Sequence, residues 1–315
     1  IGQAGENLAP MSIVLSGASH SAGGIGSVMG SKNLKAIGVH GSGGVRIAGN
    51  KDEWERLIKY HLSLLGANNQ HVVPNSPQPW AEFYDPNSRW NASRGRRWGG
   101  AAHPVDTGAC DPHDLNRIAY RSNNAAHFLG DDVWKYTVRG NGCASCPVRC
   151  HTILKVPSVS SKYDIPAVGQ KTCVGLKFGA NFFKELPGGP KGATGLEANM
   201  VGLHLADDLG VWCNYGQLQR DFIKLYHDGV IEKKLGAREY KSYSWGKYDK
   251  GDPSFLFELL PRIAGKVGEL GTALGLGTGH LLERWNLSEE TWRKDKKLGY
   301  WKLGHPKHHA SDEVG

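Results

Sequence analysis

The chain has 315 residues, 39% of them hydrophobic, and a formal net charge of +8. This length exceeds the usual size of a single hydrophobic core and predicts two domains, and the charge favours acidic or phosphate-bearing ligands. The sequence contains no apolar run of 18 residues, the length that would indicate a membrane span. It also contains no RRM, zinc-finger or helix-turn-helix signature of nucleic-acid binding. Its six cysteines are too few for a disulfide framework.

The first 50 residues form a glycine-rich unit. Residues Met11–Leu15 predict a short buried strand, and Ala36–Val39 predict a second strand after a loop that is rich in glycine. Glycines let backbone amides approach a ligand closely, so this loop is a candidate phosphate cradle. An ordinary glycine-rich turn remains the alternative. A dinucleotide fingerprint is excluded, because it needs a long helix after the glycines.

The next 60 residues divide into a helix and an irregular stretch. Residues 51–66 carry Trp54, Leu57 and Ile58 at helical spacing and predict a helix. Residues 68–112 show no period, and three arginines lie there between Trp90 and Trp98. Such interleaving could stack nucleic-acid bases, but a packed loop near a cofactor or a solvated basic face is the stronger interpretation.

Three thiols follow within eight residues. Cys143, Cys146 and Cys150 have the spacing C-x2-C-x3-C, which can direct three sulfurs at one centre. Soft thiolates select zinc or iron–sulfur clusters, and clusters commonly take three close cysteines and one distant one. Zinc sites more often show paired C-x2-C spacing, and His151 is badly placed as a fourth ligand. The spacing favours a cluster, with a zinc site and unliganded thiols as alternatives.

The remainder of the chain is predicted to be mainly helical. Residues 195–229 predict two helices, the first with Leu196, Met200, Leu203 and Ala206 on one face and Gly210 as its terminator. Residues 254–284 predict further helix, broken at the glycine-rich segment Gly268–Gly279. The expected fold class is α+β: a small glycine-rich α/β piece followed by a mostly α-helical domain.

Four stretches, in this order, resemble the tungsten or molybdenum aldehyde:ferredoxin oxidoreductase family. They are Ile1–Asn7, Gly23–Ala36, the Cys143/Cys146/Cys150 triplet and the segment Asp207-Asp208-Leu209-Gly210. The resemblance divides the chain into residues 1–50, the end of the family's pterin-binding first domain, residues 51–300, a mainly helical cluster and pterin domain, and residues 301–315, the start of a truncated third domain. The resemblance thus implies that the α/β piece is a remnant of a pterin-binding domain.

The resemblance also implies cofactors and roles. The family holds tungsten or molybdenum between two pterins bridged by magnesium, with a [4Fe–4S] cluster nearby. The resemblance implies cofactor-binding roles for eight residues: Ser21, Ala22, Gly23, Gly24, Ile25, Asp207, Gly210 and Cys213. The three clustered cysteines become cluster ligands, and the fourth ligand is expected in the missing third domain.

Three departures from the family pattern bear on function. Ala22 replaces the usual arginine before the paired glycines, and Val211-Trp212-Cys213 replaces a Leu-Asp continuation of the pterin signature. The segment expected to carry a catalytic glutamate offers only Asp164. We take Asp164 and, more weakly, His103 as candidate proton-transfer residues. Cys173 resembles a metal ligand of the benzoyl-CoA-reductase branch, although a buried structural cysteine is the simpler interpretation.

The resemblance implies an oxidoreductase that oxidises an aldehyde to a carboxylic acid and passes electrons through the cluster to ferredoxin or an iron–sulfur subunit, in the cytoplasm. Two alternatives stay open: a low-potential reductase resembling benzoyl-CoA reductase, and an electron-transfer paralogue that has lost pterin chemistry.

Overall fold

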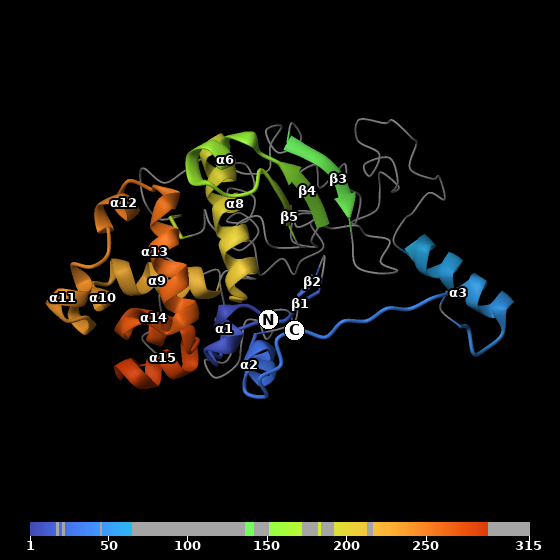
Figure 1. Cartoon of the computed structure of the whole chain (residues 1–315), viewed down its shortest axis with the longest axis horizontal. Coiled ribbons are helices and arrows are strands. Elements are labelled where there is room, and N and C mark those ends of the chain that lie inside the picture. The colour runs from blue at the N-terminus through green and yellow to red at the C-terminus, as the bar shows by residue number, and fades with distance from the viewer. Residues whose placement is uncertain are drawn as a thin grey trace.

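A computed structural model describes residues 1–16, 19–20, 23–44, 46–64, 136–141, 151–171, 182–183, 192–212 and 217–288 (Figure 1). The helices are α1 Gln3–Glu6, α2 Ile25–Gly30, α3 Lys51–Leu64, α6 Pro157–Tyr163, α8 Gly192–Leu209, α9 Gln217–His227, α10 Val230–Lys234, α11 Ala237–Tyr240, α12 Trp245–Asp249, the 3-10 turn η5 Pro253–Phe255, α13 Leu256–Gly265, α14 Gly268–Gly275 and α15 Thr278–Trp285. The strands are β1 Leu15–Ser16, β2 Ser19–His20, β3 Thr137–Asn141, β4 His151–Lys155 and β5 Val168–Lys171. Helices dominate and the strands form small sheets, which confirms the predicted α+β class.

Helix α8 is the central support of the fold. The residues predicted for its inner face, Leu196, Met200, Leu203 and Ala206, are each at most 2% exposed. The helix contacts α13, α6 and β5, as Figure 1 shows for the region between the sheet and the C-terminal helices. Because one long helix contacts all these elements, its C-terminal end has a fixed position against the rest of the core.

A three-stranded antiparallel sheet lies beside α8. β4 is its central strand, and Ile153 pairs with Arg139 on β3 and with Gln170 on β5. Gly169 faces the helix, where an added Cβ would lie 2.9 Å from the Met200 methyl carbon. A side chain there would require the Met200 side chain to move. This sheet could not be predicted from the sequence, because its strands are only four or five residues long.

The C-terminal helices close over an aromatic core. Phe222 on α9 meets Tyr248 on α12 edge to face, with ring centroids 5.1 Å apart. The Tyr248 hydroxyl is buried and donates a hydrogen bond to the carbonyl of Phe182 at 2.9 Å. This satisfies the one polar atom that the ring brings into the core.

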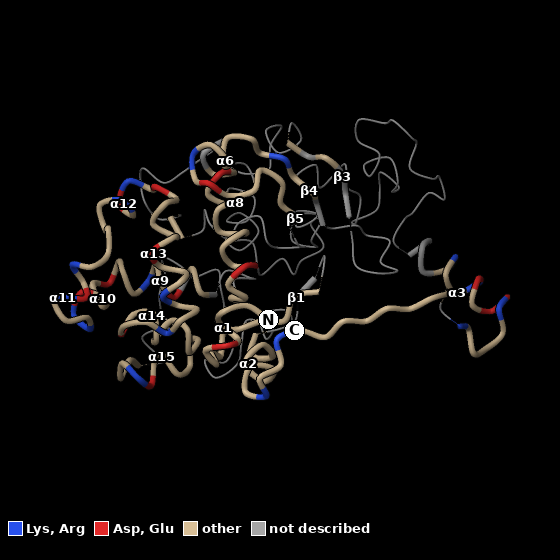
Figure 2. Tube along the Cα trace, viewed as in Figure 1, with Lys and Arg blue, Asp and Glu red and all other residues tan. Residues whose placement is uncertain are grey.

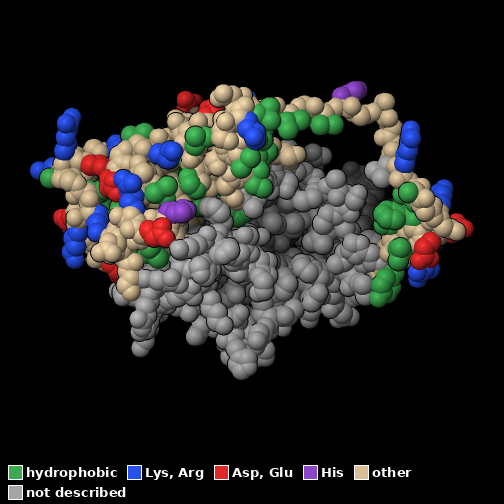
Figure 3. Space-filling model, turned by 90° about the horizontal axis from the view of Figure 1, so that it is seen from below, with side chains coloured by type: hydrophobic (Ala, Val, Ile, Leu, Met, Phe, Trp, Pro, Cys, Tyr) green, Lys and Arg blue, Asp and Glu red, His purple; other side chains and the backbone are tan. Residues whose placement is uncertain are grey.

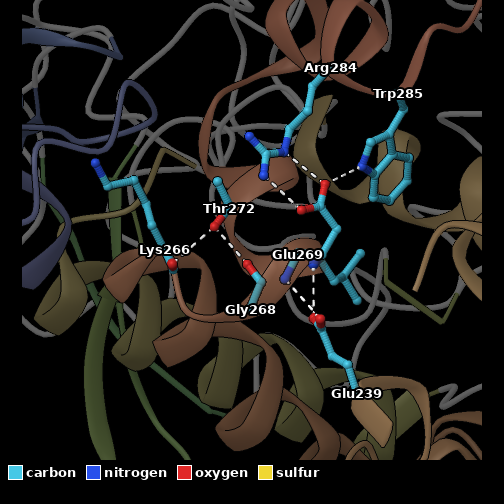
Figure 4. Close-up of polar contacts among 8 residues, drawn as sticks. Glu239, Lys266, Gly268, Glu269, Thr272, Arg284 and Trp285 are labelled. Carbon is cyan, nitrogen blue, oxygen red and sulfur yellow. Dashed lines mark hydrogen bonds and ion pairs between the residues drawn. The ribbon is translucent and has the colours of Figure 1, made fainter. Parts of the chain in front are cut away.

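A polar network joins α11, α14 and α15 (Figure 4). The Glu239 carboxylate accepts the amides of Glu269 at 2.9 Å and Leu270 at 3.0 Å, which caps the first turn of α14. Glu269 in turn accepts two hydrogen bonds of 2.7 Å from the Arg284 guanidinium and one from the Trp285 indole. Chiefly because of Arg284, the pKa of Glu269 lies below its ordinary value. The network fixes the last two helices to each other.

Two expectations about glycine-rich segments were wrong. Residues Ala36–Val39 form no strand and Val39 is 91% exposed, since no described strand lies beside them to pair with. Gly268–Gly275 is itself helix α14 rather than a break. Gly271 serves close packing there, because an added Cβ would lie 2.4 Å from the Arg262 carbonyl of α13.

The N-terminal residues share the helical core. Ala4, Ala9, Met11 and Ile13 are at most 3% exposed and belong to the same hydrophobic cluster as α8 and α13. Within the described residues, no helix is long and apolar enough to cross a membrane. The proposed division at residues 50 and 300 stays a prediction.

Candidate cofactor site

The candidate site begins at the C-terminal end of α8. The Val211 amide bonds to the Ala206 carbonyl at 2.9 Å and the Gly210 amide to the Asp207 carbonyl at 3.1 Å. Gly210 has a φ of 68°, so these bonds make a Schellman motif with glycine at the left-handed position. This confirms that Gly210 ends the helix.

Residues Met11–Ile13 connect this helix end to the glycine loop. The Ile13 amide donates to the Gly210 carbonyl at 2.9 Å, and the Trp212 amide donates to the Met11 carbonyl at 2.6 Å. Between them, the carbonyl of Ser12 accepts the Gly24 amide at 2.8 Å. The glycine loop and the Asp207–Gly210 segment are about 180 residues apart in the sequence. Both are hydrogen-bonded to the same short segment, residues 11–13. We call this meeting of residues 11–13, 23–26 and 207–212 the junction.

Backbones approach each other very closely at the junction. A Cβ added to Gly210 would lie 2.8 Å from the Gly2 nitrogen, and one added to Gly2 would lie 2.3 Å from the Leu209 carbonyl carbon. A Cβ at Gly26 would lie 2.7 Å from the Ile13 carbonyl oxygen. Only glycine fits these positions, so their spacing in the sequence reflects chain packing as well as any ligand.

The glycine loop uses part of its backbone internally. Gly24 has a φ of 92°, and both its amide and that of Gly26 donate to the Ser12 carbonyl. These two amides are therefore not available to a phosphate. Gly23 and Ile25 complete the described part of the loop, while Ser21 and Ala22 lie outside the described residues.

Asp207 has the most strongly perturbed carboxyl group near the junction. Burial and, secondarily, the charge of Asp208 raise its pKa to about 7. No described residue donates a hydrogen bond to its side chain. The hydroxyl of Ser12, which is 0% exposed, likewise has no hydrogen-bond partner among the described residues. An unsatisfied buried hydroxyl is costly, and a ligand group would relieve it, whereas the Asp207 side chain is half-buried and keeps some access to solvent.

His204, which was not among the residues predicted from the sequence, lies one turn before Asp207 and Asp208. Burial lowers its pKa, against the opposing effects of Asp208 and of a hydrogen bond with the Pro166 carbonyl. Its Nε2 atom is buried, has no hydrogen-bond partner among the described residues and lies 3.2 Å from a Cβ added to Gly169. The signal available in the sequence was a histidine three and four residues before two aspartates on one helix.

Asp164 lies at the surface rather than in the junction. It caps α6 with a φ of 54° and is exposed. Pro166, two residues later, contacts His204, so the segment that carries Asp164 approaches α8 close to the Asp207 turn. The structure brings the segments near each other without joining the two carboxylates.

The predicted metal ligands fall outside the described residues. These are Cys143, Cys146, Cys150 and Cys173, and the same holds for Cys213 and His103. Among the parts of the chain that the structure describes, no group of three histidine, cysteine, aspartate or glutamate side chains could hold a metal ion. These assignments stay predictions.

Comparison with known protein families shows to which family this chain belongs. Residues 1–41 match the N-terminal domain of aldehyde ferredoxin oxidoreductase. Residues 66–302 match its domains 2 and 3, a stretch that contains the cysteine triplet and the Asp207–Gly210 segment. The chain belongs to the aldehyde ferredoxin oxidoreductase family. The predicted resemblance is therefore confirmed.

Several relatives that match this chain are named as tungsten-containing enzymes. The tungsten-containing aldehyde ferredoxin oxidoreductase of Pyrococcus furiosus is 27% identical over 293 residues, covering 92% of this chain and 42% of its own length. That of Thermococcus kodakarensis is 25% identical and covers 78% and 36% respectively. The active-site complex of benzoyl coenzyme A reductase with 1,5-dienoyl-CoA has a TM-score of 0.47 and 18% identity, and the match covers 93% of this chain and 40% of that one. The chain thus spans about two-fifths of the length of the Pyrococcus relative.

The raised pKa of Asp207 predicts that the free energy of unfolding of this chain depends on pH. The pKa of this carboxyl is about 7 in the folded chain and returns to its ordinary value of 3.8 in the unfolded chain. Raising the pH from 4 to 7 therefore increasingly favours the unfolded chain, in which the carboxyl can ionise more readily. We expect Asp207→Asn to raise the free energy of unfolding of the cofactor-free chain by about 1–4 kcal/mol at pH 8 and to leave it nearly unchanged at pH 4.

Urea unfolding at both pH values measures this difference. Asp208→Asn is the matched control, because it removes only the smaller cause of the shift and should give a smaller gain at pH 8. A loss of stability in Asp207→Asn at pH 8 would mean that a donor outside the described residues pairs with the carboxylate.

Proposed function

We propose that this chain is the part of an aldehyde-oxidising enzyme that carries the iron–sulfur cluster and contacts a tungsten or molybdenum bispterin. The observation that carries the proposal is the family match over residues 66–302, which includes the three cysteines and the Asp207 segment. In the overall reaction an aldehyde and water give a carboxylic acid, two electrons and two protons. When bound, the metal–pterin centre supplies the two-electron oxidation and the cluster supplies single-electron transfer onward.

The junction fits a polar ligand in two respects. Asp207 offers a carboxylate without a described donor, and Ser12, elsewhere in the junction, offers a buried hydroxyl that has no partner among the described residues. One feature fits less well, because the Gly24 and Gly26 amides are already bonded to Ser12. We therefore assign pterin contact to Asp207 and the remaining loop residues, Ser21, Ala22, Gly23 and Ile25. Gly210, whose amide and carbonyl are both bonded within the junction, has a positioning role there instead. No described residue is assigned to magnesium.

The other roles follow from residue chemistry. Cys143, Cys146 and Cys150 would hold the [4Fe–4S] cluster, whose electrons pass to ferredoxin or an iron–sulfur subunit. Asp164, with His103 as the weaker candidate, would accept the proton released as the acid forms. The sparse cysteines support a cytoplasmic, reducing location. If Cys173 is a metal ligand, an aromatic thioester rather than an aldehyde would be the substrate class.

Metal content and dye-linked turnover test this function on anaerobically purified protein. We expect tungsten or molybdenum together with iron, and aldehyde-dependent reduction of a viologen dye. Asp164→Asn should lower kcat by about 10²-fold or more, because a general base is lost. Glu232→Gln, at an exposed position of α10, serves as the control and should leave kcat unchanged.

Three other results would contradict the proposal. Iron without tungsten or molybdenum would indicate the electron-transfer paralogue. Reduction of an aromatic thioester without aldehyde turnover would indicate the benzoyl-CoA-reductase-like enzyme. An unchanged kcat in Asp164→Asn would remove Asp164 from the proton-transfer step.

A further inference from the structure

A buried carboxylate fastens helix α6 to helix α8. Glu197 on α8 is only 4% exposed. It accepts a hydrogen bond from the Ser158 hydroxyl, and both of its oxygens accept from the Lys162 ammonium at 2.9 Å. Ser158 and Lys162 are four residues apart and lie on the same face of α6, so one carboxylate holds two successive turns of that helix.

The surroundings of this ion pair differ from those of a surface pair. The glutamate side chain of the Lys247–Glu258 pair is 24% exposed, against 6% for that of Glu197. Figure 3 shows exposed charges of both signs interspersed at the surface of the described residues. Exposed pairs contribute little to stability, whereas loss of the partner of a buried charge leaves that charge uncompensated. The Glu197 pair therefore restricts the position of α6 more strongly than a surface pair would.

A second contact joins the same segment to α8. After α6 the chain passes Asp164 and reaches Pro166, whose carbonyl accepts a hydrogen bond from His204. His204 follows Glu197 by seven residues, which is almost two turns, so both side chains leave α8 on the same face. Two contacts on one face of α8 thus hold the segment that runs from α6 to Pro166.

Asp164 lies between these two contacts. It comes two residues after Lys162 and two before Pro166, and the Val156 amide closes the segment at its base by donating to the Ala167 carbonyl at 2.7 Å. The φ of Asp164 is 54°, in the left-handed region that favours glycine. A residue with a side chain keeps such a conformation where the surrounding structure fixes it. The contacts to α8 therefore determine where Asp164 lies.

We propose that Glu197 is a positioning residue of the oxidation, which acts by holding Asp164 at a fixed place relative to the junction. The inference rests on the proposed function, in which Asp164 accepts the proton released as the acid forms. Figure 2 shows acidic residues beside α6 and again at the C-terminal end of α8. Because α8 is one packed helix, fixing α6 to Glu197 also fixes the Asp164 segment relative to Asp207. The Glu197 oxygens are bonded to Ser158 and Lys162, so Glu197 acts through Asp164.

Turnover of the metal-containing enzyme tests the proposal. Glu197→Gln keeps the shape of the side chain and removes its charge. We expect kcat per bound tungsten or molybdenum to fall about tenfold with KM for the aldehyde nearly unchanged, because a displaced proton acceptor slows the chemistry without weakening binding. Lys162→Met should act in the same direction, and Lys162→Arg, which keeps the ion pair, should retain the wild-type kcat. Lys247→Met breaks the exposed pair with Glu258 and, as the matched control, should leave kcat unchanged.

A double-variant cycle identifies the residue through which Glu197 acts. In the Asp164→Asn background, Glu197→Gln should cause no further loss of kcat, because the group that it positions no longer accepts the proton. Hydrogen exchange gives a readout that does not depend on turnover. The amides of residues 156–171 should exchange faster in Glu197→Gln than in the wild type, while those of α14 and α15 should exchange at the wild-type rate.

An unchanged kcat in Glu197→Gln, where Asp164→Asn lowers kcat, would overturn the inference and leave the ion pair with a role in folding alone. Equal losses from Glu197→Gln in both backgrounds would show that it acts through a different group. Unchanged exchange over residues 156–171 would show that the pair does not hold the segment. Failure of the proposed function is seen separately, in the wild type or in Asp164→Asn alone, and the inference would fall with it.

Discussion

Replacement of any one of Cys143, Cys146 and Cys150 by serine is expected to remove the iron–sulfur cluster or convert it to a smaller one. The hydroxyl of serine is a hard, weakly acidic ligand and substitutes poorly for a thiolate on iron. Because the three thiols lie within eight residues, loss of one leaves two neighbours that cannot hold the full cluster. The expected result is a large fall in iron content and a lost or altered EPR signal in each of the three variants.

Cys110→Ser provides the matched control, since Cys110 has no assigned role. It should retain the iron and the EPR signal of the wild type. Unchanged iron and EPR spectra in all three test variants would refute the cluster assignment. Bound zinc without iron in the wild type would instead support the zinc interpretation of the same spacing.

The parts of the fold that follow a local rule could be predicted from the sequence. The inner face of α8 has apolar residues at helical spacing, and all four predicted positions are buried. Gly210 ended the helix as expected, because the left-handed position after a helix favours glycine. Leu218, Phe222 and Leu225 on α9, which recur at helical spacing in the sequence, are also buried.

The parts that depend on distant contacts could not be predicted. Ala36–Val39 has strand-like composition but lies exposed, because strand formation requires a partner and no described strand pairs with it. The sheet of β3, β4 and β5 is held by pairing between its strands and by contact of Gly169 with α8. Nothing local in these short segments marks that arrangement.

The candidate site shows the same division. Family motifs identified the glycine loop and the Asp207 segment, and the structure places both on residues 11–13. The motifs did not indicate that Gly24 and Gly26 direct their amides to Ser12, or that His204 contacts Pro166. These features arise when segments far apart in sequence meet, so only the folded chain reveals them.

The close approach at the junction predicts a large effect of Gly210→Ala. An alanine Cβ would lie 2.8 Å from the Gly2 nitrogen and 3.0 Å from its Cα, and both are backbone atoms that cannot rotate away. The φ of 68° adds strain of about 1–2 kcal/mol for any residue with a Cβ. Overpacking adds about 1–3 kcal/mol. We therefore expect Gly210→Ala to lower the free energy of unfolding by about 2–5 kcal/mol, measured by urea unfolding, which is a large fraction of typical domain stability.

Gly229→Ala separates the steric cause from the backbone strain. Gly229 has a nearly identical φ of 65°, but a Cβ there would meet no atom within 4 Å. Its loss of stability should therefore be limited to the strain of about 1–2 kcal/mol. Equal losses in the two variants would mean that the junction can relax around a methyl group.

If instead Gly210→Ala loses much more stability than Gly229→Ala, the displaced backbone is that of Gly2, whose neighbour α1 packs on α8 and α13. The Ile13 bond to the Gly210 carbonyl would then shift as well, and with it the segment that holds the glycine loop. The variant should consequently retain less tungsten or molybdenum even where it remains folded, whereas Gly229→Ala should retain the wild-type amount.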